Sequence, residues 1–327
     1  MPFLWRPWAA PPSTPARFIL SRDPYPSLAR TVGLLVGTLL AAFVLARATM
    51  ALFPDWPDIL QMAVPTEIAL AAAVMYAIRR TGLSWRDALG FQAMEARALA
   101  PLALIVIGSV AVFSELYVVI QRIVPVPEAF ESMLRDLLQM DGSVDFMFTL
   151  LVAVIVAPAL EEALFRGVIL QGLARRYGPH TASFWTAAFF ALFHLYNPWQ
   201  ILPTFLLGLI LAWLVLSTRS LVASMVAHSV FNGVSLGIAG ASLNGTLPDE
   251  IPETWLLAGI VLTLIAASVA LLVGLVWLEK QTGGGWFAES GDEPPPGMGD
   301  DPLGRQTPYA AGSSSAEGRA GPFTARG

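Results

Sequence analysis

The stretch Ala159-Leu-Glu-Glu-Ala-Leu-Phe-Arg-Gly167 places two adjacent acids and one base inside the most apolar part of the chain. An ionisable side chain at membrane depth costs between about 3 and more than 10 kcal/mol, depending on the reference state. Leucine at these positions would carry no such cost. We therefore interpret Glu161, Glu162 and Arg166 as residues that serve a chemical function as well as the fold.

The composition is typical of a polytopic membrane protein. Apolar residues make up 55% of the 327 residues and charged residues 13%, well outside the range of soluble domains. The sequence contains no cysteine, which excludes disulfides, thiolate nucleophiles and cysteine-ligated metals. The modest net charge of -5 and the lack of a basic patch argue against nucleic-acid binding. The predicted fold class is all-α, with the lipid bilayer as the surrounding solvent.

Apolar runs long enough to cross about 30 Å of hydrocarbon as helices define the predicted spans. Eight runs qualify: 31–53, 59–78, 98–123, 146–173, 182–197, 199–217, 221–240 and 254–278. The fifth run is short and the fourth is amphipathic at its C-terminal end, so seven spans is the alternative count. No internal repeat of the kind found in inverted-repeat transporters is visible.

The chain divides into an N-terminal arm (1–30), a transmembrane domain (31–280) and a tail rich in Gly, Pro and Ser (281–327), which we expect to be disordered. Charges at the ends of the spans alternate in sign, beginning with Arg30 before the first span and Asp55 after it. By the positive-inside rule, this alternation predicts eight crossings of the inner (cytoplasmic) membrane with both termini in the cytosol.

Two connections and three further charges are predicted to have structural roles. Residues 84–91 have the pattern of a short cytosolic interfacial helix, and residues 128–140 that of an amphipathic helix on the outer surface. Arg47, Glu67 and Glu115 fall in the outer halves of the first three spans. These three could pair with one another as a structural network, and Arg47 could instead snorkel to the interface; we assign none of them to catalysis.

Helical spacing gives the two adjacent glutamates different partners. Glu162 and Arg166 stand at i and i+4, so they share a helix face and can pair. Glu161 is turned by about 100° from Glu162, so Arg166 cannot easily hold both carboxylates. We therefore predict that Glu162 is neutralised and fixed, whereas Glu161 faces a cavity as a candidate general base.

Two further motifs place polar side chains in apolar segments. His228 and Asn232 stand at i and i+4 in Ala227-His-Ser-Val-Phe-Asn232, and Phe190 and His194 repeat that spacing in the fifth apolar run. An imidazole or amide N–H near a developing oxyanion stabilises it by roughly 3 kcal/mol. The two motifs are therefore candidates to assist the glutamates. Helices four, five and seven, which carry the glutamates and the two motifs, are predicted to form a membrane-embedded cavity.

The three motifs resemble those of the CAAX protease and bacteriocin-processing family (CPBP or Abi), a family of intramembrane proteases. Its pattern is Glu-Glu-x-x-x-Arg, then Phe-x-x-x-His, then His-x-x-x-Asn, and here all three occur in order within about 146–240. The resemblance implies an endopeptidase that acts on a membrane-associated peptide or protein. It assigns water activation to Glu161, support of the site to Glu162 and Arg166, positioning to His194 and His228, and oxyanion stabilisation to Asn232.

The resemblance leaves two mechanisms open. Glu161, His194 and His228 would make a three-ligand zinc site with one open position. Zinc catalysis also needs a separate base, and the motif His-Glu-x-x-His is absent from the sequence. We favour the metal-free glutamate mechanism and predict no firm cofactor, with Zn²⁺ as the alternative.

Two other classes of function use the same residues. In a transporter or channel, Glu161, Glu162 and the histidines would form a proton or ion relay. In a non-catalytic scaffold or immunity protein, they would be a relic of the motif set. The Glu162–Arg166 pair could then be a structural ion pair alone.

Overall fold

The apolar runs form long helices, which the computed structural model describes over residues 25–56, 58–91, 94–132, 143–243, 253–282, 298–300 and 306–308. The chain divides into two units, Met1–Trp286 and Phe287–Gly327. The second unit contains two short antiparallel strands, β1 (Met298–Asp300) and β2 (Gln306–Pro308). The rest of the tail predicted to be disordered lies outside the described residues.

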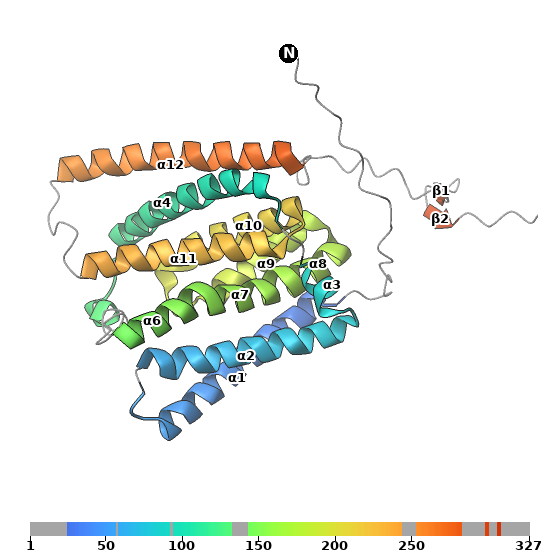
Figure 1. Ribbon diagram of the computed structural model, residues 1–327, viewed down its shortest axis with the longest axis horizontal. Coiled ribbons are helices and arrows are strands. Elements are labelled where there is room, and N and C mark those ends of the chain that lie inside the picture. The colour runs from blue at the N-terminus through green and yellow to red at the C-terminus, as the bar shows by residue number, and fades with distance from the viewer. Residues whose placement is uncertain are drawn as a thin grey trace, which may run out of the picture. The chain divides into compact units, whose positions relative to one another are not determined.

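The first unit is a bundle of helices (Figure 1). Its α-helices are α1 (Leu28–Leu52), α2 (Asp58–Thr81), α3 (Trp85–Leu89), α4 (Leu99–Ile123), α6 (Ser143–Leu151), α7 (Ala157–Glu162), α8 (Leu170–Tyr177), α9 (Pro179–Phe193), α10 (Ile201–Thr218), α11 (Leu221–Leu243) and α12 (Glu253–Thr282). Two 3₁₀ turns, η1 (Ala96–Ala98) and η4 (Pro198–Gln200), begin α4 and α10. Two π-helical segments, η2 (Val152–Val156) and η3 (Ala163–Ile169), flank α7.

Seven helical stretches among the described residues are long and apolar enough to cross a membrane. They are Leu28–Leu52, Leu60–Thr81, Ala96–Ile123, Met147–Tyr177, Pro198–Thr218, Leu221–Ile238 and Val261–Gln281. The protein is therefore an all-α polytopic membrane protein, as predicted, and its described residues contain seven candidate spans, which is the alternative count. The difference lies at the fifth run, where α9 ends after 15 residues and so rises only about 22 Å.

The short helix α9 still runs along the bundle, because it packs against both α8 and α10. The start of α1 and the end of α12 lie at the same end of the bundle (Figure 1). The bundle thus begins and ends at one end, because α9 runs back between α8 and α10 as a shorter pass in addition to the seven candidate spans. Which side of the membrane this end faces stays a prediction.

Of the two predicted surface helices, the structure describes the first completely and the second in part. Residues 85–89 form α3, which starts at Ser84, whose Oγ accepts the backbone N–H of Asp87 at 3.2 Å. It ends at Gly90 with a left-handed φ of 62°, a conformation that suits glycine. Of the predicted outer helix, residues 128–132 are helical, and the remainder lies outside the described residues.

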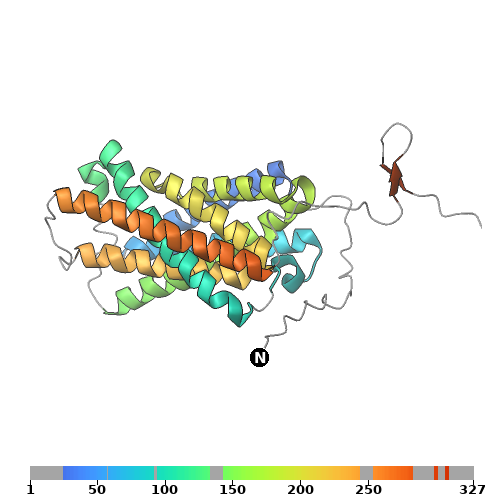
Figure 2. The same ribbon diagram turned by 90° about the horizontal axis from the view of Figure 1, so that it is seen from above.

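Helices α4 and α12 pack along one another in both views (Figures 1 and 2). Glycine makes this possible, since a Cβ atom at Gly108 would lie 2.7 Å from the Ala267 carbonyl oxygen and from the Leu271 nitrogen. Small residues at such crossings let helix backbones approach within the membrane. This pair lies apart from the three motifs and forms one wall of the bundle.

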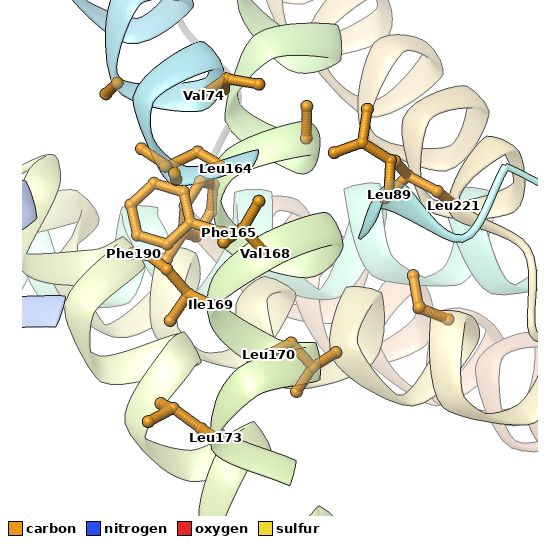
Figure 3. Packing of buried hydrophobic residues seen from close by; sticks show 14 of the residues in the cluster. Val74, Leu89, Leu164, Phe165, Val168, Ile169, Leu170, Leu173, Phe190 and Leu221 are labelled. Atoms are coloured by element: carbon orange, nitrogen blue, oxygen red, sulfur yellow. The ribbon is translucent and has the colours of Figure 1, made fainter. Parts of the chain in front are cut away.

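The continuous helical segment from α6 to α8 runs through the centre of the bundle. Leu164, Phe165 and Ile169 are fully buried and share one apolar cluster with Leu70 of α2 and Phe190 of α9. Figure 3 shows this packing, with the rings of Phe165 and Phe190 next to each other. Every residue of η3 is buried, so the polar groups of this part of the segment must find their partners within the bundle.

Candidate active site

The ion pair predicted from helical spacing is present and fully buried. Arg166 Nη1 donates to Glu162 Oε1 at 2.7 Å, and both side chains are 0% exposed. Arg166 Nη2 also donates to the Gly208 carbonyl oxygen on α10, at 3.3 Å. The guanidinium therefore neutralises Glu162 and ties the central segment to a second helix.

His228 brings α11 to this pair. Its Nδ1 lies 3.0 Å from Glu162 Oε1, the same oxygen that Arg166 holds. An ionised carboxylate only accepts hydrogen bonds, so His228 Nδ1 carries a proton and donates it. In the neutral ring, Nε2 is then the acceptor, and it lies 3.8 Å from Glu161 Oε2. This distance is too long for a direct hydrogen bond, but both atoms can contact one water molecule at about 2.8 Å.

The two glutamates differ in access as well as in partners. The side chain of Glu161 is 13% exposed, whereas that of Glu162 is 0% exposed. No described residue makes a hydrogen bond to Glu161, whose nearest ion-pair partner is His228. The structure thus places a fixed carboxylate beside an accessible one.

His194 lies just past the end of α9, where the sequence predicted a position deep within a span. The turn at 194–196 begins here, and His194 Nδ1 lies 2.9 Å from the Phe190 carbonyl oxygen. Since a carbonyl only accepts, Nδ1 donates and Nε2 is left as the acceptor. The ring is connected to the other motifs through Phe190, since none of the hydrogen bonds of the described residues joins it to Glu161 or His228.

Asn232, one turn from His228 on α11, is held by the backbone of the central segment. Its Nδ2 donates to the Ala153 carbonyl oxygen in η2 at 3.0 Å. A primary amide has two N–H donors, so one remains for a ligand. The geometry therefore allows the predicted contact with an oxyanion while the side chain stays anchored.

Phe190 is the residue on which the three motifs converge, and sequence reasoning gave it no role of its own. Its fully buried ring lies 4.8 Å from the His194 ring, 5.6 Å from the His228 ring and 5.2 Å from the Phe165 ring, between centroids. The Arg166 guanidinium stacks on it at 4.3 Å. The signal in the sequence was its i, i+4 spacing to His194.

We expect Phe190→Leu to lower kcat for peptide cleavage about 10- to 100-fold with little change in KM. The loss follows because both imidazoles lose the surface that orients them, and small displacements of positioned groups cost about this much. The matched control is Phe165→Leu, which removes a neighbouring buried ring that contacts neither imidazole. The role is supported if Phe190→Leu and Phe165→Leu lose similar thermal stability but Phe190→Leu loses much more kcat. Equal losses of kcat in the two variants contradict it.

Glu67 of α2 is the residue whose surroundings sequence reasoning misjudged. The predicted network of Arg47, Glu67 and Glu115 is wrong, since no ion pair of the described residues joins them and Arg47 Nη1 contacts Met50 Sδ at 3.8 Å. Helix α2 packs against α7, which carries Glu161. The Oε2 atom of Glu67 is buried without a hydrogen-bond partner among the described residues.

The signal that would have placed Glu67 was present in the sequence. Glu67, Leu70 and Val74 stand at i, i+3 and i+7, so they share one face of α2. Leu70 and Val74 belong to the apolar cluster that includes Leu164 of the central segment. Glu67 therefore faces the central segment too, about one turn from Leu70.

The candidate zinc ligands do not form a metal site in the described part of the chain. No group of three or more His, Asp or Glu residues there is arranged to hold an ion. His194 and His228 each donate from Nδ1, to the Phe190 carbonyl and to Glu162, which leaves Nε2 of both rings as an acceptor. The three candidate zinc ligands are thus not grouped in this structure, and the catalytic steps below are written for the chain's own side chains.

Comparison with known proteins identifies the central segment. Residues 143–234 match the family model described as type II CAAX prenyl endopeptidase Rce1-like. No curated protein and no solved structure gives a significant match to the chain. The matched segment contains all three motifs, of which Arg166, His194 and His228 contact Glu162 or Phe190. Residues 143–234 therefore form an Rce1-like domain of the CAAX protease and bacteriocin-processing family.

Proposed function

We propose that the protein is an intramembrane endopeptidase that hydrolyses a peptide bond of a membrane-associated peptide or protein, with Glu161 as general base. The observation that carries this proposal is the pairing of an accessible carboxylate, Glu161, with the fully buried and neutralised Glu162. The family match supports a protease. A site that needed only structural charge would leave no accessible acid beside the ion pair.

In the first step, a water molecule lies between Glu161 Oε2 and His228 Nε2, which are 3.8 Å apart. Glu161 removes a proton from this water while His228 Nε2 accepts a second hydrogen bond and orients it. The oxygen then attacks the scissile carbonyl carbon, and the carbonyl oxygen becomes an oxyanion. The N–H of Asn232 that is not bonded to Ala153 donates to that oxyanion.

In the second step, the tetrahedral intermediate collapses and the C–N bond breaks. The proton that Glu161 took from water passes to the leaving amine, which returns the carboxylate to its starting state. His194 Nε2 is an acceptor at the edge of the site and helps to position water or substrate. Atoms and charge balance, and the products are a carboxylic acid, which keeps the second proton of the water, and an amine.

Glu162 and Arg166 act through His228. The carboxylate accepts a hydrogen bond from His228 Nδ1 at 3.0 Å, which fixes the ring orientation and leaves Nε2 as the acceptor. Arg166 keeps Glu162 ionised by holding the same oxygen at 2.7 Å. This division of labour explains why a membrane protein retains both an acid and a base that are fully buried.

We further propose that the end of the bundle carrying both termini faces the cytosol. Arginines gather at the helix ends on that side: Arg79, Arg80, Arg175, Arg176 and Arg219. Because the chain has no cysteine, single-cysteine variants can be labelled without background. In intact cells, a membrane-impermeant maleimide should label Asp55→Cys and leave Thr81→Cys unlabelled. The reverse pattern contradicts this orientation.

The test of the proposed function is cleavage by the purified protein. The protein is purified in detergent, its metal content is measured, and it is incubated with a library of membrane-anchored peptides whose products are identified by mass spectrometry. We expect cleavage by the wild type and none by Glu161→Gln. Proton flux in liposomes that depends on Glu161, without cleavage, would instead support a transporter. Binding without either activity would support a scaffold.

A further inference from the structure

The hydrogen bond that anchors Asn232 ends on a backbone carbonyl within a helix, where acceptors are normally occupied. In an α-helix the carbonyl of Ala153 would accept the N–H four residues later, at Ala157. Here the Ala157 N–H bonds to the Val152 carbonyl instead, five residues back, because η2 is π-helical. The first helical partner of the Ala153 carbonyl is thereby removed.

The second helical partner is missing for a different reason. In the π-helical register, Ala153 would pair with the N–H of the residue five positions later, which is Pro158. Proline has no N–H. Register and sequence together therefore open the Ala153 carbonyl, and an open carbonyl at membrane depth costs several kcal/mol unless a donor reaches it. Asn232 Nδ2 is that donor, at 3.0 Å.

The neighbouring packing is consistent with this close approach. Helix α11 contacts both η2 and α7. Gly233, the residue after Asn232, faces η2, and a Cβ there would be in van der Waals contact with Val154 Cγ1 at 3.4 Å. The residues around Asn232 on α11 thus lie against the segment that carries the Ala153 carbonyl.

We propose that Pro158 is a positioning residue of the active site, because it keeps the Ala153 carbonyl open as the anchor of Asn232. With one N–H fixed on this carbonyl, the amide presents its other N–H to the substrate oxyanion in a single orientation. The inference rests on the proposed function for its catalytic consequence. Its structural part, the dependence of the Asn232 anchor on Pro158, stands independently.

The experiment is the substitution Pro158→Ala, which supplies an N–H that can compete for the Ala153 carbonyl. We expect kcat to fall about 10- to 100-fold with KM changed less than twofold, because the second N–H of Asn232 matters most when the oxyanion forms. The melting temperature should stay level or rise, since alanine restores a helical hydrogen bond. Pro101→Ala, a buried proline near the start of α4, is the matched control and should leave kcat unchanged.

A double-variant cycle separates positioning from a purely structural role. Pro158→Ala should add no further loss of kcat in the background Asn232→Ala, because the anchored group is already gone. Additive losses, or an unchanged kcat in Pro158→Ala, overturn the proposal.

An experimental structure of Pro158→Ala gives a readout that does not depend on activity. We expect Asn232 Nδ2 to leave the Ala153 carbonyl oxygen in this variant. If the distance stays near its value here, the inference fails even where cleavage is observed. If no peptide is cleaved by the wild type, the proposed function fails, and the structural part is judged by this distance alone.

Discussion

Glu161→Gln is expected to lower kcat for peptide cleavage by about 100- to 10,000-fold, the range that a positioned general base contributes. Glutamine keeps the size of the side chain and its hydrogen-bonding capacity, but its amide oxygen cannot take a proton from water at neutral pH. KM should change little, because the substrate can still bind beside His228 and Asn232. Single-turnover cleavage of a membrane-anchored peptide measures the chemical step directly.

The fold of Glu161→Gln should be intact, because Glu161 is partly exposed and no described residue makes a hydrogen bond to it. Thermal unfolding followed by tryptophan fluorescence should show a melting temperature equal to or above that of the wild type. Glu115→Gln is the matched control, since it removes a partly buried glutamate from α4 that no motif contacts. Equal activity of Glu161→Gln and wild type would rule out Glu161 as the base.

Arg166→Met is expected to destabilise the protein by about 3–5 kcal/mol, the usual cost of leaving a buried charge without its partner. Three contacts are lost together: the bond to Glu162 at 2.7 Å, the bond to the Gly208 carbonyl at 3.3 Å, and the stacking on Phe190 at 4.3 Å. The free energy of unfolding in mixed micelles, measured against a rising denaturant concentration, gives the loss.

The double variant Glu162→Gln with Arg166→Met separates charge from packing. It should recover more than half of the lost stability, because the uncompensated charge is gone and the glutamine oxygen still accepts a hydrogen bond from His228 Nδ1. It should not recover kcat, because the weaker acceptor no longer holds the ring as a carboxylate does. Glu95→Gln is the matched control, since it breaks an ion pair to Arg97 whose side chains are 60% and 46% exposed, and it should cost about 0–1 kcal/mol. A single variant Arg166→Met as stable as the wild type would contradict the argument.

Local spacing accounts for the parts of the site that sequence reasoning placed correctly. Glu162 and Arg166 lie on one helix face whatever the rest of the bundle does, because the separation of i and i+4 is fixed by backbone geometry. The same geometry turned Glu161 away from Arg166. The apolar runs gave the all-α fold and the spans for a similar reason, since hydrocarbon thickness sets the length of a spanning helix.

The predicted end of the fifth span and the predicted network of Arg47, Glu67 and Glu115 were wrong, because the sequence pattern fits more than one helix end and more than one set of partners. The run 182–197 is apolar to its end, yet α9 stops at Phe193 and His194 begins a turn. Leu195 and Tyr196 in that turn are exposed, as lipid-facing residues of a span would also be, so composition did not mark the boundary. Glu67 was grouped with Arg47 and Glu115 by depth alone, although its helix face points to the central segment.

The sequence by itself determined the membrane-spanning class of the fold, the pairing of Glu162 with Arg166, and the three motifs from which the family could be inferred. Only the tertiary structure decided that His228 donates to Glu162 and that Asn232 bonds to Ala153, across 66 and 79 residues of chain. The physical reason is that helix geometry fixes neighbours within one turn. Contacts between helices depend on their rotation and axial position, which the packing of the whole bundle sets.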